Sequence, residues 1–214
     1  MADSTFRVRV RGEMACFTRP EFSTERVSYE IITPSAARGV LEAILWKPAI
    51  RWEILSIFLL KPVRWIAFRR NEVNSRISTR DAASAALHGA TLRAFFADED
   101  RAQRNTLALR DVDYLIEARI HMTERGGAED NPSKFREMFT RRLERGQQHY
   151  QPYLGCREFP AWVEPPNDAP AALDETRSLG LMLHDIEFGI HNEARFFQAN
   201  LEHGVLQVPE WRKS

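Results

Sequence analysis

Two segments of the chain alternate apolar and polar residues with a period of two, which predicts β-strands with one buried face. In residues 6–11, phenylalanine and valine alternate with arginine. The arginines are Arg7, Arg9 and Arg11. In residues 112–122 the polar face ends in His121. Each strand therefore has an apolar face for a core and a charged face that points away from it.

Two further segments have the 3.6-residue period and the end signals of helices. Thr33 and Pro34 suit a cap and a first turn, and Pro48 ends this helix. Its predicted apolar face consists of Ala37, Val40, Leu41, Ile44 and Leu45. The other helix opens at Asn131 and stops at Gly146. Its predicted apolar residues are Phe135, Met138, Phe139 and Leu143.

The first turn of the second helix contains a lysine, Lys134, where the positive end of the helix dipole opposes a cation. The arrangement becomes favourable when an anion binds, because N–H groups and a cation converge on it. Arg141 and Arg145 each lie within about 20° of Lys134 around the helix. This cationic stripe indicates either phosphate contacts or a solvated amphipathic face.

The order of the remaining elements indicates the fold class. Residues 51–60 and 63–73 are strand-like, residues 74–104 are polar and irregular, and residues 179–188 and 194–201 again have strand patterns. The first part approximates the βαββαβ order of a ferredoxin-like domain, in which one sheet face stays open, as in RNA-recognition domains. We therefore predict an α+β protein. Residues 1–150 would form a ferredoxin-like (RRM-like) domain, and residues 151–214 a small C-terminal antiparallel β-sheet domain.

Composition narrows the function only slightly. The chain has 214 residues, 43% hydrophobic and 28% charged, with zero formal net charge, which describes an ordinary globular protein. A nucleic-acid binder then needs a local basic face, because the total charge gives no support. No segment has the apolar length of a membrane span or a signal peptide, so we expect a cytoplasmic protein without a membrane partner. Cys16 and Cys156 have no metal or redox spacing.

No nucleotide-binding or nucleophile-elbow motif is present, and the six histidines lack metal-ligand spacing, so we expect no cofactor and no metal. Metal-free RNA cleavage would need a base for the 2′-OH, an acid for the leaving oxygen and a cation for the phosphorane. His121 could be such an acid or base, or a surface histidine. The arginines at residues 7–11 could bind phosphates, or could protect an edge strand by charge.

Three motifs together carry a resemblance to a known family. They are Ser28-Tyr29, residues 33–39 (TPSAARG) leading to residues 43–48 (AILWKP), and residues 154–159 (LGCREF). The chain resembles the CRISPR-associated Cas family five, Dvulg or type I-C subtype, over nearly its whole length. The resemblance implies a ferredoxin-like fold with a small C-terminal sheet.

The resemblance also implies an endoribonuclease that cuts precursor crRNA within each repeat, below a stem-loop. Metal-independent attack by the 2′-OH would give a cyclic phosphate. The protein would then stay with the CRISPR repeat RNA as a subunit of the type I-C interference complex, beside the backbone and large subunits. The alternative is a structural subunit that binds RNA, or duplex DNA without sequence preference, and does not cut.

The family comparison transfers only part of a catalytic site. In some members a tyrosine precedes Trp-Lys-Pro and a Lys-His pair begins the later helix, whereas this chain has Leu45 and Phe135 at the tyrosine and histidine positions. Lys134 remains, and Tyr29 and His121 are the candidate replacements. The predicted nucleic-acid-binding residues are Arg7, Arg9, Arg11, Arg38, Lys47, Arg141 and Arg145.

Overall fold

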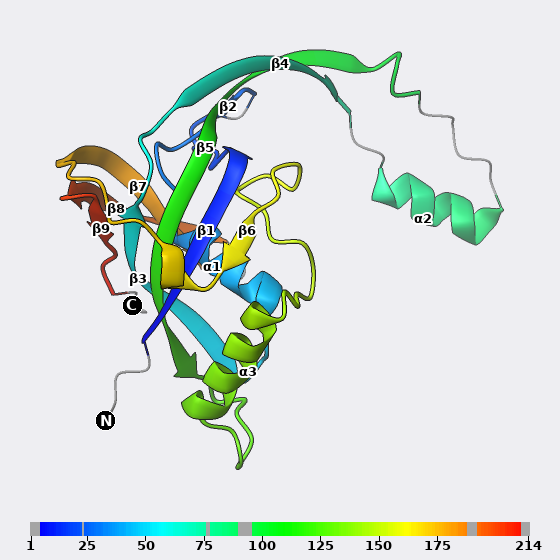
Figure 1. Cartoon of the computed structure of the whole chain (residues 1–214). Coiled ribbons are helices and arrows are strands. Elements are labelled where there is room, and N and C mark those ends of the chain that lie inside the picture. The colour runs from blue at the N-terminus through cyan, green and yellow to red at the C-terminus, as the bar shows by residue number, and fades with distance from the viewer. Residues whose placement is uncertain (1–4, 23, 76–77, 90–95, 188–191, 211–214) are drawn as a thin grey trace.

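The structure is a computed structural model that describes residues 5–22, 24–75, 78–89, 96–187 and 192–210. Its centre is an antiparallel sheet in the order β6-β1-β5-β3-β9-β8-β7 (Figure 1). The strands on this path are β1 (Thr5–Ala15), β3 (Ile50–Leu59), β5 (Arg101–Met122), β6 (Trp162–Glu164), β7 (Arg177–Glu187), β8 (Glu193–Glu202) and β9 (Val205–Gln207). The short strand β2 (Arg26–Val27) pairs with β5 in parallel. The predicted combination of helices with an antiparallel sheet is confirmed.

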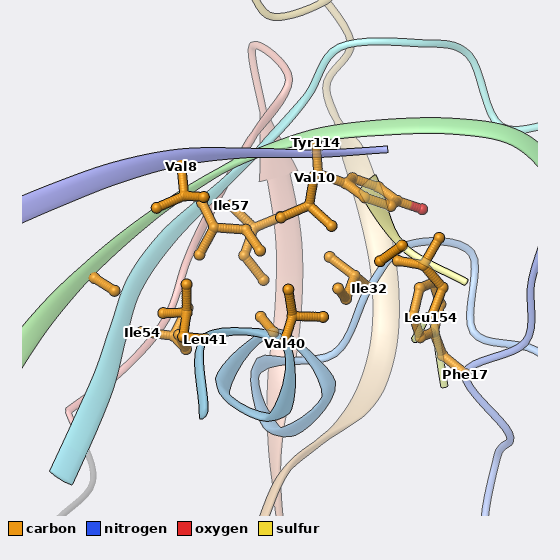
Figure 2. Close-up of a cluster of buried hydrophobic side chains, with 14 of the residues drawn as sticks. Val8, Val10, Phe17, Ile32, Val40, Leu41, Ile54, Ile57, Tyr114 and Leu154 are labelled. Atoms are coloured by element: carbon orange, nitrogen blue, oxygen red, sulfur yellow. The ribbon is translucent and has the colours of Figure 1, made fainter. Parts of the chain in front are cut away.

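Two helices cover one face of the sheet. Thr33 caps α1 (Pro34–Ile44) by accepting a hydrogen bond from Ala36 N, and Asn131 caps α3 (Pro132–Glu144) in the same way. The apolar residues of β1, β3 and β5 point towards α1 (Figure 2). Labelled members of this core are Val8, Val10, Val40, Leu41, Ile54, Ile57 and Tyr114. Both helices therefore begin at the predicted caps and pack the predicted faces.

The pairing register of β1, β3 and β5 determines which residues lie together on the sheet face opposite the two helices. Arg7 lies opposite Glu117, and Glu53 of β3 lies opposite Arg119. Because side chains alternate along a strand, His121 shares this polar face, away from α1 and α3. The structure thus separates an apolar, helix-covered face from a charged one.

A long arm leaves the body of the protein. It consists of β4 (Trp65–Val73), which pairs with the first part of β5, and of α2 (Thr79–His88) at its outer end (Figure 1). The sequence analysis expected irregular structure in residues 74–104, and this was wrong. Ser78 caps α2, four alanines favour the helix, and Gly89 ends it with a φ of 63°. Residues 76–77 and 90–95 of that stretch lie outside the described residues.

The C-terminal strands continue the main sheet. β6 pairs with β1, and β9 pairs with β3 and joins β8 and β7 to it. Hydrogen bonding therefore runs across residue 150, where the sequence analysis divided the chain, and the two-domain division stays a prediction. Among the described residues, no helix is both long and apolar enough to cross a membrane.

Candidate nucleic-acid interface

The start of α3 places Lys134 at the surface beside a carboxylate. Asn131 Oδ1 accepts a hydrogen bond from Lys134 N at 3.0 Å, which fixes the first turn. Lys134 Nζ lies 2.8 Å from Asp130 Oδ1, and its side chain is 47% exposed. The hydrogen bond and charge of Asp130 raise the pKa of Lys134, and the same contact lowers the pKa of Asp130. Lys134 is therefore a charged, accessible group that a phosphate could take over from Asp130.

The predicted stripe along α3 is exposed. Lys134, Arg141 and Arg145 are all solvent-accessible, while Phe135 and Phe139 are buried beneath them. Phe139 packs edge-on against Trp52 and Phe6, with ring centroids 4.8 and 5.5 Å away. The rigid contact of α3 with the core thus holds three cations in a row on its outer side.

His121 belongs to a small polar cluster on the charged sheet face. Its Nε2 lies 2.5 Å from Glu53 Oε2, and Arg119 Nε lies 3.3 Å from the same oxygen. The Glu53 side chain is 9% exposed and that of His121 is 39% exposed. A carboxylate on Nε2 makes this nitrogen the proton-bearing one and leaves Nδ1 as the acceptor. The contact with Glu53 fixes the orientation of the imidazole ring.

The three arginines of β1 face carboxylates on neighbouring strands. Arg9 donates two hydrogen bonds to Asp113, at 3.0 and 2.7 Å, and the Asp113 side chain is 1% exposed. This contact raises the pKa of Arg9 further above its usual range. Arg7 pairs with Glu117 and Arg11 with Glu164, both at 2.8 Å, and Arg9 also lies 3.7 Å from Glu164. The stripe is therefore largely neutralised within the protein, and Arg9 in particular holds the sheet together.

Tyr29 lies inside the protein, where its residue is 1% exposed. Its hydroxyl accepts a hydrogen bond from Leu183 N at 3.3 Å, and Arg19 lies over its ring at 4.7 Å. Burial raises the pKa of Tyr29, although the bond from Leu183 opposes the shift. In this position Tyr29 ties the loop after β2 to β7.

The structure does not bring the three catalytic candidates together. His121 lies near the end of β5, and Lys134 lies at the start of α3, the next helix along the chain; the strand register places His121 on the sheet face away from α3. Tyr29 N donates to Phe17 O, at the other end of β1 from the α3 contact. Strand β1 separates the two ends by roughly 30 Å.

The last two predicted binding residues lie on and just after α1. Arg38 forms ion pairs with Glu42 at 3.0 Å and Asp185 at 2.7 Å, whereas Lys47 is exposed. A cavity of about 250 Å³ opens beside Arg38, between α1, β3 and β7. Its charged lining residues are Arg38, Arg51, Glu53, Asp185 and Glu187. With three acids against two arginines, this cavity does not have the charge of a phosphate site.

The positions where some family members have a tyrosine and a histidine are occupied here by buried hydrophobic residues. Leu45 is fully buried and accepts a hydrogen bond from Trp52 Nε1 through its carbonyl oxygen at 2.9 Å. Phe135 is 3% exposed. Neither side chain can transfer a proton, so any acid–base chemistry must come from other groups.

The sequence did not lead us to the acidic residues that pair with the candidate site residues. Asp130 stands four residues before Lys134, which is the spacing of a helical ion pair and could have been noticed. Glu53 and Asp113 are 68 and 104 residues away from their partners, His121 and Arg9. Only the strand register brings these groups together.

Comparison with known proteins agrees with the resemblance seen in the sequence. Residues 5–209 match the family described as Cas_Cas5d, CRISPR-associated protein (Cas_Cas5). A protein of Mannheimia succiniciproducens, named CRISPR pre-crRNA endoribonuclease Cas5d, is 46% identical over 95% of this chain and 94% of its own length. A Thermus thermophilus protein of the same name is 41% identical over 95% of this chain and 90% of its own.

The fold also has relatives among solved structures. A crystal structure of a CRISPR-associated protein superposes with a TM-score of 0.70 at 20% identity, covering 97% of this chain and 93% of the other. A functionally uncharacterized protein of Streptococcus mutans superposes with a TM-score of 0.67 over the same shares, also at 20% identity. These two likenesses concern the fold alone, whereas the family match and the two close relatives span almost the whole sequence. The chain therefore belongs to the Cas5d family of CRISPR-associated proteins.

Proposed function

We propose that this protein is an endoribonuclease that cuts precursor CRISPR RNA within the repeat and then stays with its product. The observation that carries the proposal is its identity of 46% and 41%, over 95% of the chain, to two relatives named pre-crRNA endoribonucleases. The partners are the repeat RNA and the other subunits of a type I-C CRISPR complex. The cytoplasm, where these partners are made, is the proposed location.

The proposed reaction is intramolecular attack of the ribose 2′-OH on the adjacent phosphate. The bond to the 5′-oxygen breaks, which leaves a cyclic phosphate on one product and a 5′-hydroxyl on the other. The step requires proton removal from the 2′-OH, proton delivery to the leaving oxygen, and stabilisation of the phosphorane. All three can be supplied by side chains that this chain contains.

Lys134 is the proposed stabiliser of the phosphorane. It is exposed, charged and fixed by the Asn131 cap, and its partner Asp130 is an exchangeable surface carboxylate. Arg141 and Arg145 continue the cationic row and are the proposed contacts for neighbouring phosphates. Lys47, exposed after α1, is a further proposed contact.

His121 is the proposed proton-transfer group, because Glu53 orients its ring and leaves Nδ1 available. Since its side chain lies on the face away from α3, RNA would have to pass around the end of β5 to meet both groups. The position of Tyr29 supports a structural contribution through its bond to Leu183. Four of the predicted RNA-binding arginines form ion pairs within the protein, which supports a structural role for them as well. They are Arg7, Arg9, Arg11 and Arg38, and the proposed RNA contacts do not include them.

The ferredoxin-like arrangement is part of the proposal. In the order of the chain, β1, α1, β3, β5, α3 and β6 follow the βαββαβ pattern, and their strands have the spatial order β6-β1-β5-β3. The fourth strand of the pattern comes from residues 162–164. An RNA-binding part built mainly from residues 1–150 would therefore borrow one strand from the C-terminal part, which contributes β7, β8 and β9.

A second candidate function is binding without cleavage. It is favoured by the buried leucine and phenylalanine, Leu45 and Phe135, at the positions where some members of the family have a tyrosine and a histidine. In that case the row on α3 would hold repeat RNA, or duplex DNA, by phosphate contacts alone.

The test is to incubate the purified protein with its own repeat RNA in EDTA and to map the product ends. The proposal expects one cut per repeat, with a cyclic phosphate and a 5′-hydroxyl. Intact RNA that is nonetheless bound would support the second function. Equal competition by random duplex DNA at matched salt would indicate binding without sequence preference.

A further inference from the structure

The two cysteines, which have no part in the proposed function, meet inside the protein. Cys16 follows β1, and Cys156 lies between α3 and β6; both are buried. Cys156 Sγ lies 3.6 Å from Cys16 O, and Cys16 N donates to Leu154 O at 3.0 Å. The backbones are so close that a Cβ on Gly155 would lie 2.1 Å from Cys16 O. Two segments 140 residues apart are thus held in direct contact where the two cysteines lie.

The two thiols are not equivalent. Arg26 Nη1 donates a hydrogen bond to Cys156 Sγ at 3.2 Å, whereas the printed partner of Cys16 Sγ is Thr18 Oγ1, at 3.7 Å. Interaction with the nearby Cys16 side chain, followed by the hydrogen bond from Arg26, lowers the pKa of Cys156 to about 6, although burial opposes the shift. The interaction with Cys156 and burial raise the pKa of Cys16 above its usual range. Cys156 is therefore the more acidic of the two thiols.

The Arg26 side chain extends from the Cys156 sulfur to the protein surface. It is 36% exposed and forms ion pairs with Glu72 at 3.2 Å and Glu158 at 3.7 Å. A thiolate beside a guanidinium at the edge of the core is the setting in which cysteines react with small oxidants. A buried structural cysteine would have neither the cation nor the nearby second thiol.

We propose that Cys156 is a peroxide-reactive site and that Cys16 is its resolving partner, so that oxidation joins them in an intramolecular disulfide. The Cys156 thiolate attacks one oxygen of hydrogen peroxide; the O–O bond breaks, and the departing hydroxide takes a proton to become water. Cys156 is then a sulfenic acid. Cys16 gives up its proton as its sulfur attacks Cys156, and the S–O bond breaks to release a second water. Two thiols are oxidised by two electrons and one peroxide is reduced to two waters.

The bond would join the end of β1 to the segment that leads into β6. Because β6 pairs with β1 at the edge of the sheet, oxidation would fasten this edge covalently. The inference is independent of RNA cleavage, since none of the groups involved lies at the start of α3.

The test uses the reduced full-length protein and hydrogen peroxide, followed by iodoacetamide, peptide mapping and intact mass. The wild type is expected to lose both free thiols, to weigh two hydrogen atoms less, and to remain a single chain on a non-reducing gel. In Cys16→Ser, dimedone is expected to trap a sulfenic acid at Cys156. Arg26→Gln is expected to slow the reaction several-fold. Arg69→Gln, an exposed change on β4, is the control and should react like the wild type.

A readout on the wild type keeps the proposal testable even if a variant folds poorly. Before oxidation, Cys156 should be alkylated faster than Cys16, with a pH midpoint of about 6. Equal alkylation of the two thiols, survival of both in peroxide, or disulfides formed only between chains would each overturn the proposal.

Discussion

Replacing Asp113 with alanine is expected to destabilise the fold strongly, because the Arg9 guanidinium loses its two hydrogen bonds to a carboxylate and keeps only Glu164, 3.7 Å away. Asp113 accepts two hydrogen bonds from Arg9, and their side chains are 1% and 19% exposed. Breaking a buried ion pair costs about 3–5 kcal/mol, and breaking an exposed one about 0–1 kcal/mol. Since Arg9 keeps some contact with water, we expect the lower part of the buried range, about 3 kcal/mol.

Urea unfolding followed by circular dichroism measures this loss. With a slope of about 2 kcal/mol per molar urea, the midpoint should fall by about 1.5 M. Arg9→Met combined with Asp113→Ala should recover part of the loss, because no charge is then left unpaired. Arg11→Met is the matched control: it also removes a β1 arginine, but its ion pair with Glu164 is exposed and should contribute about 1 kcal/mol or less.

Two results would refute the reasoning. One is a loss of unfolding free energy for Asp113→Ala that is no larger than the loss for Arg11→Met. The other is a double variant whose loss equals the sum of the two single losses. Either result would indicate that Asp113 does not hold Arg9 firmly, and Arg9 would again be a candidate for RNA binding.

Three further predictions concern α3. Asn131→Ala should lower the unfolding free energy by about 1 kcal/mol, because the Lys134 N–H loses its cap; urea unfolding checks this. Phe139→Ala should cost about 3–5 kcal/mol in the same assay, since its buried ring packs against Trp52 at 4.8 Å. Asp130→Asn should tighten repeat-RNA binding in a filter assay, because it removes the carboxylate that competes with phosphate for Lys134. Unchanged affinity for that variant, or a gain that persists in Asp130→Asn/Lys134→Ala, would argue against phosphate contact at Lys134.

Much of the fold follows from local patterns in the sequence. The alternation in β1 and the ends of α1 and α3 are set by neighbouring residues, and so they could be read directly. The cap and alanines of α2 carried the same kind of signal, but the polar composition of the stretch hid it. The pairing of β6 with β1 and of β9 with β3 could not be read, because short strands gain their stability from partners distant in sequence.

The candidate site was less accessible to sequence reasoning. Exposure of Lys134 follows from its place on an amphipathic helix, and that part needed no structure. The pairing of Arg9 with Asp113 and of His121 with Glu53 depends on strand register across about 100 and 70 residues. Burial of Tyr29 depends on the contact of its loop with β7. The sequence therefore shows where cationic residues lie, but only the structure shows which of them are paired with carboxylates and which can contact RNA.

The central claim is that Lys134 stabilises the transition state of metal-independent RNA cleavage. The most direct measurement is the single-turnover rate on repeat RNA in EDTA for the wild type and for Lys134→Ala, with RNA affinity measured alongside. The control is Lys61→Ala, another partly exposed lysine held by a carboxylate, Asp111. We predict a loss of about a hundredfold or more for Lys134→Ala with binding largely kept, and no loss for the control. Cleavage by Lys134→Ala at the wild-type rate would contradict the account.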